Sequence, residues 1–141
     1  MVNEIMDGIS VKLNQVFDDG YEIYGDRDVV QGLKEPCFFI AVLHPSQAKL
    51  IGQRYFREHP FDVQYFPKDS GNNTELHRVA SELFEALEYI TLLNGDLVHG
   101  TSMDYEIVDG VLHFKVNYNM FLKKETQLDP METLDVDEKT I

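Results

Sequence analysis

Two alternating apolar runs meet at Asp109-Gly110, and this stretch restricts the possible folds more than any other part of the chain. Both residues of an Asp-Gly pair can adopt a positive φ, as a two-residue hairpin loop requires. A loop of this length fixes the register of its two strands. The register predicts one apolar face, formed by the pairs Ile107 with Leu112, Tyr105 with Phe114 and Met103 with Val116.

The opposite face of this hairpin is charged. Glu106 lies across from His113, and Asp104 lies across from Lys115. Opposite charges on facing positions stabilise paired strands, so we expect a solvated outer face and a scaffolding role for the hairpin. Continued outward, the same register predicts two further pairs, Leu97 with Leu122 and Val98 with Phe121.

The length and composition are those of one folded domain with a substantial core. The chain has 141 residues, 43% of them hydrophobic, including nine Phe and seven Tyr. Its longest apolar run, residues 36–43, is too short to span a membrane. No basic start precedes an apolar segment, so no export signal is expected. The single Cys37 excludes an internal disulfide and fits a reducing cytosol.

The net charge of −13 limits the partners that the chain can have. General nucleic-acid binders use Lys and Arg to neutralise phosphates, so an acidic chain argues against that class. The charge is compatible with a surface that repels DNA, with binding to a basic protein, or with solubility alone.

Two stretches have the apolar periodicity of amphipathic helices. The first covers residues 3–18, with Asn3 placed to cap its start. The second is predicted to begin after a cap at Asn72 or Asn73. Its apolar stripe consists of Leu76, Val79, Ala80, Leu83, Leu87 and Ile90.

Several shorter stretches are predicted as strands. Residues 21–24 are a short candidate, and residues 61–67 alternate as a half-buried strand does. Residues 49–58 alternate less cleanly and are predicted as a strand or an extended loop. Residues 25–35 are polar and irregular, and Asn94-Gly95 is predicted to turn the chain.

The segment Pro36 to Leu43 is apolar at every position, which is typical of a strand buried on both faces. The helices can cover one face. In a chain this small, another subunit could cover the second face, so this strand hints at an oligomer. Its candidate interface residues are Phe38, Ile40 and Val42.

The composition changes after Lys124. Residues 125–141 contain six acidic residues and a single basic residue, Lys139, together with Pro130. We therefore predict a domain over 1–124 and an acidic C-terminal tail over 125–141 that is flexible or becomes ordered on a partner.

No catalytic or metal-binding constellation stands out. The five histidines are scattered, and a structural zinc site needs clustered Cys and His. Cys37 lies in an apolar strand, where a free cysteine is usually a small buried hydrophobe. The glycines form neither a P-loop nor a dinucleotide fingerprint. We predict no enzymatic activity, no cofactor and no metal.

Arginines and aromatic residues alternate over residues 53–66. Such a pattern can stack on single-stranded nucleic acid, although Glu58 and Asp62 interrupt it here. Alternating aromatics more often belong to a core, and Arg beside aromatics is typical of a protein interface. The candidate interface residues in this segment are Arg54, Tyr55, Phe56 and Arg57.

The order helix, strands, helix and hairpin resembles small tail proteins of phages and prophages of Gram-positive bacteria, and most closely the phage tail terminators. The resemblance covers roughly residues 1–125. It is carried by the early helix, Gln31-Gly32-Leu33 before Pro36-Cys37-Phe38-Phe39-Ile40, Arg54-Tyr55, Phe61-x-Val63-x-Tyr65-Phe66, Asp109-Gly110-Val111-Leu112-His113-Phe114 and Asn117-Tyr118.

The resemblance implies an α+β fold in which two helices pack on an antiparallel β-sheet. It also implies a homo-oligomeric ring, typically of six subunits, on the last ring of the tail tube. The expected partners are further copies of the chain, the tail tube protein and the head–neck connector proteins, while DNA passes through the channel without specific binding. The expected locations are the virion tail and, during assembly, the host cytoplasm.

Two alternatives stay open at this point. One is a neck, head-completion or other minor tail protein, because fold resemblance transfers function poorly among such proteins. The other is a small cytosolic ligand-binding or enzymatic domain.

Overall fold

A computed structural model describes residues 1–26, 32, 34–69, 71 and 73–124. Contacts within the chain group these residues into two compact units. The large unit consists of Met1–Ser46 and Glu58–Met120, and the small unit of Gln47–Arg57 with the described residues 121–124. The predicted domain over 1–124 contains both units. The predicted acidic tail over 125–141 lies outside the described residues, as do most of residues 25–35.

The first helix forms where its apolar periodicity predicts it. Helix α1 spans Val2–Phe17 and starts one residue before the predicted cap. A short 3-10 turn, η1, follows over Asp18–Gly20, and the Gly20 N–H donates to Asp18 Oδ1 over 2.9 Å. The stripe that packs against the sheet consists of Ile5, Met6, Ile9, Leu13 and Phe17.

The second helix is shorter than the apolar stripe predicts. Helix α2 spans Asn73–Ala86, and the chain then enters strand β6 at Tyr89–Thr91, which contains Ile90. The prediction that Ile90 belongs to the helix is therefore wrong. Ile90 is fully buried on β6, and a place on the apolar stripe of the helix would bury it too. The expected burial of a residue therefore does not distinguish a last helical turn from a short strand. The helical cap predicted at Asn72 lies outside the described residues.

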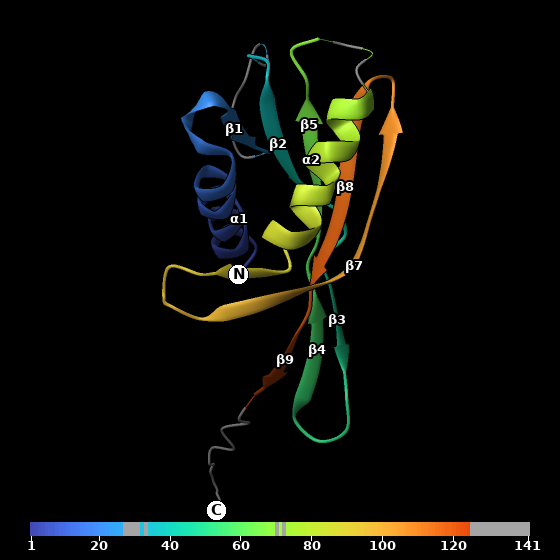
Figure 1. Cartoon of the computed structure of the whole chain (residues 1–141). Helices are drawn as coiled ribbons and strands as arrows, with labels where there is room; N and C mark the ends of the chain where they lie inside the picture. Colours follow the sequence, from blue (N-terminus) through green and yellow to red (C-terminus); the bar gives the residue numbers. More distant parts are fainter. Residues whose placement is uncertain (27–31, 33, 70, 72, 125–141) are drawn as a thin grey trace, which may run out of the picture. The chain divides into compact units, whose positions relative to one another are not determined.

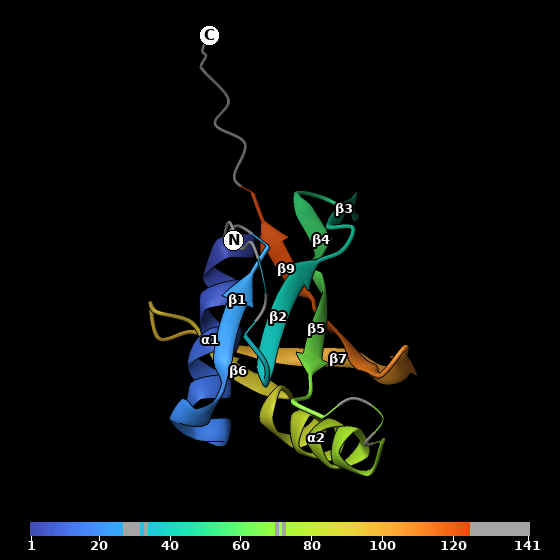
Figure 2. The ribbon, with the colours of Figure 1, turned by 90° about the horizontal axis from the view of Figure 1, so that it is seen from above.

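A six-stranded sheet forms the centre of the large unit, in the order β1-β2-β5-β8-β7-β6 (Figures 1 and 2). Strands β1 and β2 are parallel, and the other neighbours are antiparallel. The α+β prediction is confirmed, with a mixed, mostly antiparallel sheet in place of a purely antiparallel one. The bounds not yet given are β1 Glu22–Gly25, β2 Cys37–Val42, β5 Pro60–Phe66, β7 Leu97–Val108 and β8 Val111–Tyr118.

The hairpin of β7 and β8 has the predicted register near its turn. Asp109 and Gly110 have φ values of 52° and 76°, and both predicted charged pairs face each other across the two strands. The confirmed pairs are Ile107 with Leu112, Tyr105 with Phe114, Glu106 with His113 and Asp104 with Lys115.

Farther from the turn the predicted register is wrong. A bulge between Thr101 and Asp104, where Ser102 has a φ of 53°, shifts the pairing. Beyond it, Leu97 and Val98 pair with β6 rather than with Leu122 and Phe121. The extra residue shifts the later β7–β8 pairs by one position. Phe121 and Leu122 lie in the strand Met120–Lys123, which belongs to another sheet.

The small unit is built around a second sheet, which the sequence did not predict. Its strands are β3 Ser46–Lys49, β4 Arg54–Glu58 and β9 Met120–Lys123, in the order β3-β4-β9. The Leu50 N–H donates to the Arg54 carbonyl over 2.8 Å and closes the β3–β4 loop. The Lys124 N–H donates to the Gln53 carbonyl over 2.9 Å. The Phe56 and Phe121 rings are also in contact, tilted by 47° with their centroids 5.0 Å apart.

Candidate interaction surfaces

The three interface residues predicted on β2 contribute mostly to the core of the subunit itself. Phe38 and Ile40 are fully buried, and Val42 is half-buried against the same core. The Phe38 ring lies 5.0 Å from the rings of both Phe17 and Tyr65. The chain's own helix and strands therefore already cover this face. Because Phe38 and Ile40 have no exposed surface in the subunit, the interface that we propose for this protein does not include them.

The Arg and aromatic pattern over 53–66 is divided between the two units. Phe61, Val63 and Tyr65 belong to β5 and are core residues of the large unit. The predicted residues Arg54 to Arg57 lie on β4, with Arg54 exposed and the other three half-buried. Of the three interpretations given for this pattern, burial in the core therefore accounts for its second half.

Contacts inside the small unit hold three of the four predicted β4 residues. Arg57 donates twice to the Gln47 side chain, from Nε over 3.0 Å and from Nη2 over 2.6 Å. The Lys124 ammonium lies 4.7 Å from the centre of the Tyr55 ring. The Arg57–Gln47 bonds join β4 to its neighbour β3, whereas the Tyr55–Lys124 and Phe56–Phe121 contacts join segments that are far apart in the sequence.

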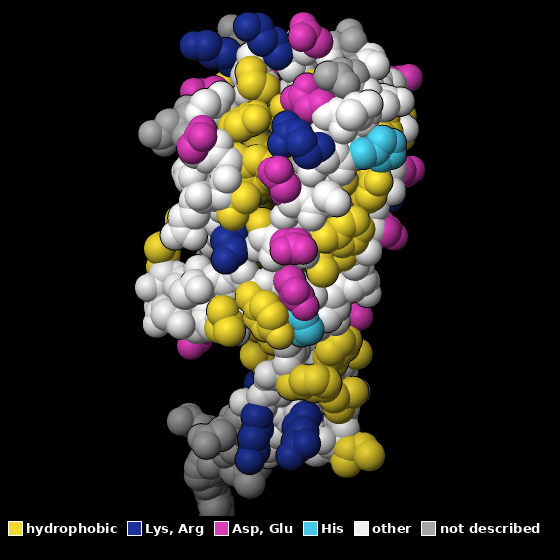
Figure 3. Space-filling model, in the orientation of Figure 1, with side chains coloured by type: hydrophobic (Ala, Val, Ile, Leu, Met, Phe, Trp, Pro, Cys, Tyr) yellow, Lys and Arg dark blue, Asp and Glu magenta, His cyan; other side chains and the backbone are white. Residues whose placement is uncertain are grey.

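Positive charge is concentrated on the small unit, a feature that the sequence reasoning missed. Its described residues include no Asp or Glu, and its basic residues are Lys49, Arg54, Arg57, Lys123 and Lys124. Figure 3 shows Lys and Arg side chains next to each other on this unit. Two basic stretches far apart in the chain meet in one sheet, so counting charges along the chain does not show them as one cluster.

The loop between β3 and β4 carries exposed apolar side chains beside this charge. Ile51 is 95% exposed and Leu50 is also exposed. Lys49 and Arg54 line the same shallow hollow as these two residues. Phe121 on β9 is 72% exposed. Exposed apolar side chains that cluster together, unlike isolated ones, mark candidate contact surfaces.

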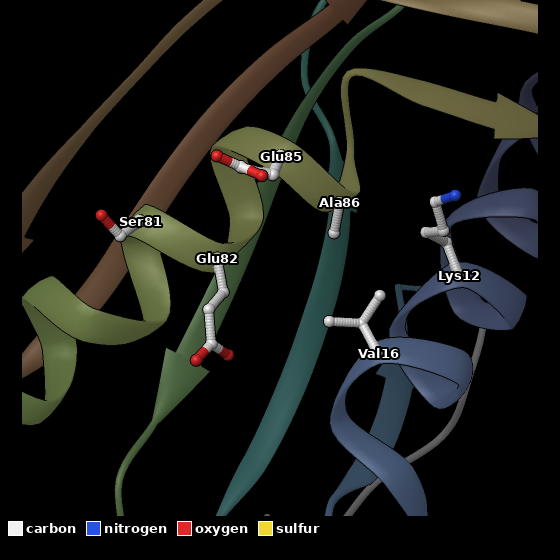
Figure 4. A pocket seen from close by; sticks show the side chains of 6 residues that line it. All are labelled: Lys12, Val16, Ser81, Glu82, Glu85 and Ala86. Carbon is white, nitrogen blue, oxygen red and sulfur yellow. The ribbon is translucent and has the colours of Figure 1, made fainter.

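The large unit has a groove between its two helices. It encloses about 550 Å³ and is lined from α1 by Lys12 and Val16, and from the α2 side by Ser81, Glu82, Glu85 and Ala86. Figure 4 shows Val16 and Ala86 pointing into the space between the helices. Val16 is 44% exposed, so the groove has an accessible apolar part beside two carboxylates.

A second hollow, of about 480 Å³, lies on the large unit and includes charged residues from β5, β7 and β8. Its carboxylates already have partners. His113 Nδ1 lies 3.1 Å from Asp62 Oδ2, and Lys115 Nζ lies 3.8 Å from Glu106 Oε2. His113 is therefore joined to Asp62, in addition to facing Glu106 across the hairpin.

Three buried titratable groups, Cys37, Tyr65 and Tyr118, favour their neutral forms. Burial raises the pKa of the Cys37 thiol to about 11, with Glu35 and Glu22 adding to the shift. Burial also raises the pKa of Tyr65 and of Tyr118. Tyr65 donates to Glu75 over 2.5 Å, and Tyr118 donates to the Leu87 carbonyl over 2.8 Å. A thiol that stays protonated is a poor nucleophile, as the sequence interpretation of Cys37 requires.

Metal sites and membrane spans each need a particular arrangement of the described residues. Within this part of the chain, no group of three or more His, Cys, Asp or Glu side chains is arranged to hold a metal ion. The helices of the same part are all too short or too polar to cross a membrane.

The fold defines the class of protein: a small α+β protein in which two helices pack on a mixed, mostly antiparallel sheet. The family model of the phage tail terminator proteins matches residues 4–130, so the chain belongs to that family. It is accordingly a structural protein of the phage tail, and its family is not an enzymatic one.

Several solved structures have a similar fold, and one of them has a TM-score of 0.50 and 12% sequence identity to this chain. The alignment covers 89% of this chain and 97% of the other. At this identity the likeness supports the fold alone. None of the curated proteins matches the chain.

Proposed function

We propose that this protein is the tail terminator itself, acting as a homo-oligomeric ring, a hexamer, on the last ring of the tail tube. The ring stops further polymerisation of the tube and presents the surface that joins the tail to the head–neck connector. The observation that carries this proposal is the match to the tail terminator family over residues 4–130.

A ring of identical subunits sets a requirement on the surfaces of each subunit. Its interface is heterologous, so every copy must present two different, complementary surfaces. This chain carries such a pair. The described part of the small unit has a formal charge of +5, while the residues of the large unit include far more Asp and Glu than Lys and Arg. The interface that we propose therefore includes Arg54, Tyr55, Phe56 and Arg57 of the small unit and Val42 of the large unit.

The remaining partners follow from the position at the end of the tube. One face of the ring binds the tail tube protein and the other binds the head–neck connector proteins. DNA passes through the channel, and the net charge of −13 per subunit disfavours binding to its phosphates. The protein acts in the virion tail, after assembly in the host cytoplasm.

Deletion of the gene in an inducible phage tests this proposal, with expression from a plasmid as the control. We expect tails of uncontrolled length that do not join heads, measured by electron microscopy of the lysate. Tails of normal length without heads would instead indicate a neck or head-completion protein. Normal particles would contradict both functions.

A further inference from the structure

We infer that the tip of the β3–β4 hairpin, residues Lys49 to Arg54, binds in the groove between α1 and α2 of a second copy of this chain. Ile51 fills the apolar part of the groove, and Arg54 pairs with Glu85 at its rim. This inference rests on the proposed ring and identifies the surfaces that would join its subunits.

The hairpin tip has the form of an apolar anchor with basic flanks. Ile51 is almost completely exposed, and the hydrogen bond from Leu50 to Arg54 holds the loop closed below it. Gly52 has a φ of 78°, which lets the chain turn sharply next to Ile51. Lys49 and Arg54 stand at the two ends of this loop and are both exposed. When a partner covers an exposed, branched apolar side chain, apolar surface is removed from water and the complex is stabilised.

The groove has the matching features. Val16 and Ala86 provide apolar surface between the helices, and its volume of about 550 Å³ exceeds that of an isoleucine side chain (Figure 4). Glu82 already pairs with Arg78 over 3.1 Å. Glu85 is exposed and has no ion pair among the described residues, so it is the rim carboxylate that is available to a basic partner.

The second hollow of the large unit is a weaker receptor for the same tip. Its two carboxylates, Asp62 and Glu106, are paired with His113 and Lys115. An incoming Arg would have to displace one of those partners. A lysine lines each site, Lys115 here and Lys12 in the groove between the helices, so the difference between them is Glu85, which has no ion pair among the described residues. Electrostatic complementarity therefore favours the groove between the helices.

Charge also indicates that the occupant is another copy of the chain. Copies with a net charge of −13 repel each other, and a ring brings them close together. Within the described part of the large unit, the basic residues stand apart from one another in the sequence, at Lys12, Lys34, Lys68, Arg78 and Lys115. Placing the basic small unit of one copy against the acidic large unit of the next offsets this repulsion at every interface of the ring.

Mixed-subunit cross-linking tests the contact directly. Copies with Ile51→Cys and copies with Val16→Cys carry different affinity tags and are mixed under mild oxidation. We expect a disulfide between differently tagged copies. The native Cys37 does not compete, because it is fully buried and its thiol stays protonated. Val108→Cys, an exposed position in the second hollow, is the matched control for Val16→Cys.

Two outcomes of the cross-linking would overturn the inference. One is cross-linking that is as efficient to Val108→Cys as to Val16→Cys. The other is a disulfide that forms only within one chain of an Ile51→Cys/Val16→Cys double variant, because it would place the tip on its own subunit.

A charge exchange gives an independent test. We expect Arg54→Glu and Glu85→Lys each to raise the subunit concentration needed for ring assembly by about tenfold, measured by analytical ultracentrifugation. The double variant Arg54→Glu/Glu85→Lys should recover most of that loss, because the pair is restored with its charges reversed. Monomer unfolding curves of all three variants confirm that each one folds.

The results separate this inference from the proposed function. If the wild type forms rings and the single variants assemble as it does, the inference fails while the ring stands. If the double variant is no better than either single variant, the Arg54–Glu85 pairing fails. If the wild type forms no ring, either alone or on tail tubes, the proposed function and the inference both fail.

Discussion

Burial decides the chemistry of Cys37. The wholly apolar sequence around Cys37 predicts that it is a small core residue, and its side chain is fully buried on β2. The same strand also shows that an apolar run does not reveal whether its own subunit or a second one buries it. Phe38 and Ile40 are apolar enough for a subunit interface, but they pack against Phe17 and other residues of their own chain. Sequence indicates that a residue is buried, while the tertiary structure decides what buries it.

Alkaline pH should destabilise the fold partly through Cys37. The unfolded thiol ionises near its ordinary pKa of 9.0, and the folded thiol near 11. Between these values the unfolded state has lost a proton that the native state keeps, so the free energy of unfolding falls as pH rises. We expect this fall to be smaller in Cys37→Ala, measured by urea unfolding at pH 7, 9 and 10.5 as the chosen conditions. Tyr65 and Tyr118 have raised pKa values too, so part of the fall remains.

An equal decrease in the wild type and in Cys37→Ala would contradict this account. A second readout is the reaction of the thiol with a thiol-specific reagent at neutral pH. We expect no reaction in the folded protein and complete reaction in denaturant.

At the scale of elements, the patterns that depend on near neighbours predict well. Helix α1 and the turn between β7 and β8 form as predicted, because helix periodicity and turn chemistry involve residues close in sequence. The end of α2 and the bulge near Ser102 are not predicted. The end of α2 depends on the pairing of β6 with β7, next to which the Gly100 N–H donates to the Glu88 carbonyl over 2.6 Å, and the bulge belongs to the pairing of β7 with β8.

The hairpin turn gives a test at this scale. Gly110→Val should lower the free energy of unfolding by about 1–2 kcal/mol, because a side chain with a Cβ is strained at the positive φ of this position. Asp109→Gly is the matched control. It should be close to neutral, since glycine tolerates the φ of 52° there. Chemical denaturation measures both variants, and equal effects would count against strain in the turn as the cause.

At the scale of the whole molecule, the distribution of charge matters more than its total. An acidic chain argues against binding to nucleic acid, yet its small unit is basic. This basic cluster combines residues near position 50 with residues just before position 125. Of the residues predicted as an interface, Arg54 to Arg57 lie on that unit, whereas Phe38 and Ile40 lie in the core of the other.

Charge reversal on the small unit should impair assembly and leave the monomer folded. We expect Arg54→Glu/Arg57→Glu to weaken ring formation by at least about tenfold, because two positive charges leave the proposed interface. Lys34→Glu/Lys68→Glu makes the same change in net charge at exposed positions of the large unit and should assemble nearly normally. Size-exclusion chromatography with light scattering measures the rings, and thermal unfolding checks the monomer. Equal losses in both variants would point to general repulsion instead of a local contact.

Local sequence patterns were sufficient to predict the first helix, the core of the second, the hairpin turn with its nearby register, and the burial of the apolar strand at 37–42. Each of these depends on interactions between residues a few positions apart. Three features became apparent from the three-dimensional arrangement alone: the point where α2 ends and β6 begins, the bulge that shifts the register of β7, and the pairing of distant strands in the second sheet. These features depend on hydrogen bonds between segments far apart in the chain, whose partners local patterns do not specify. The basic cluster of the small unit is of this second kind, because it exists only where β4 and β9 meet.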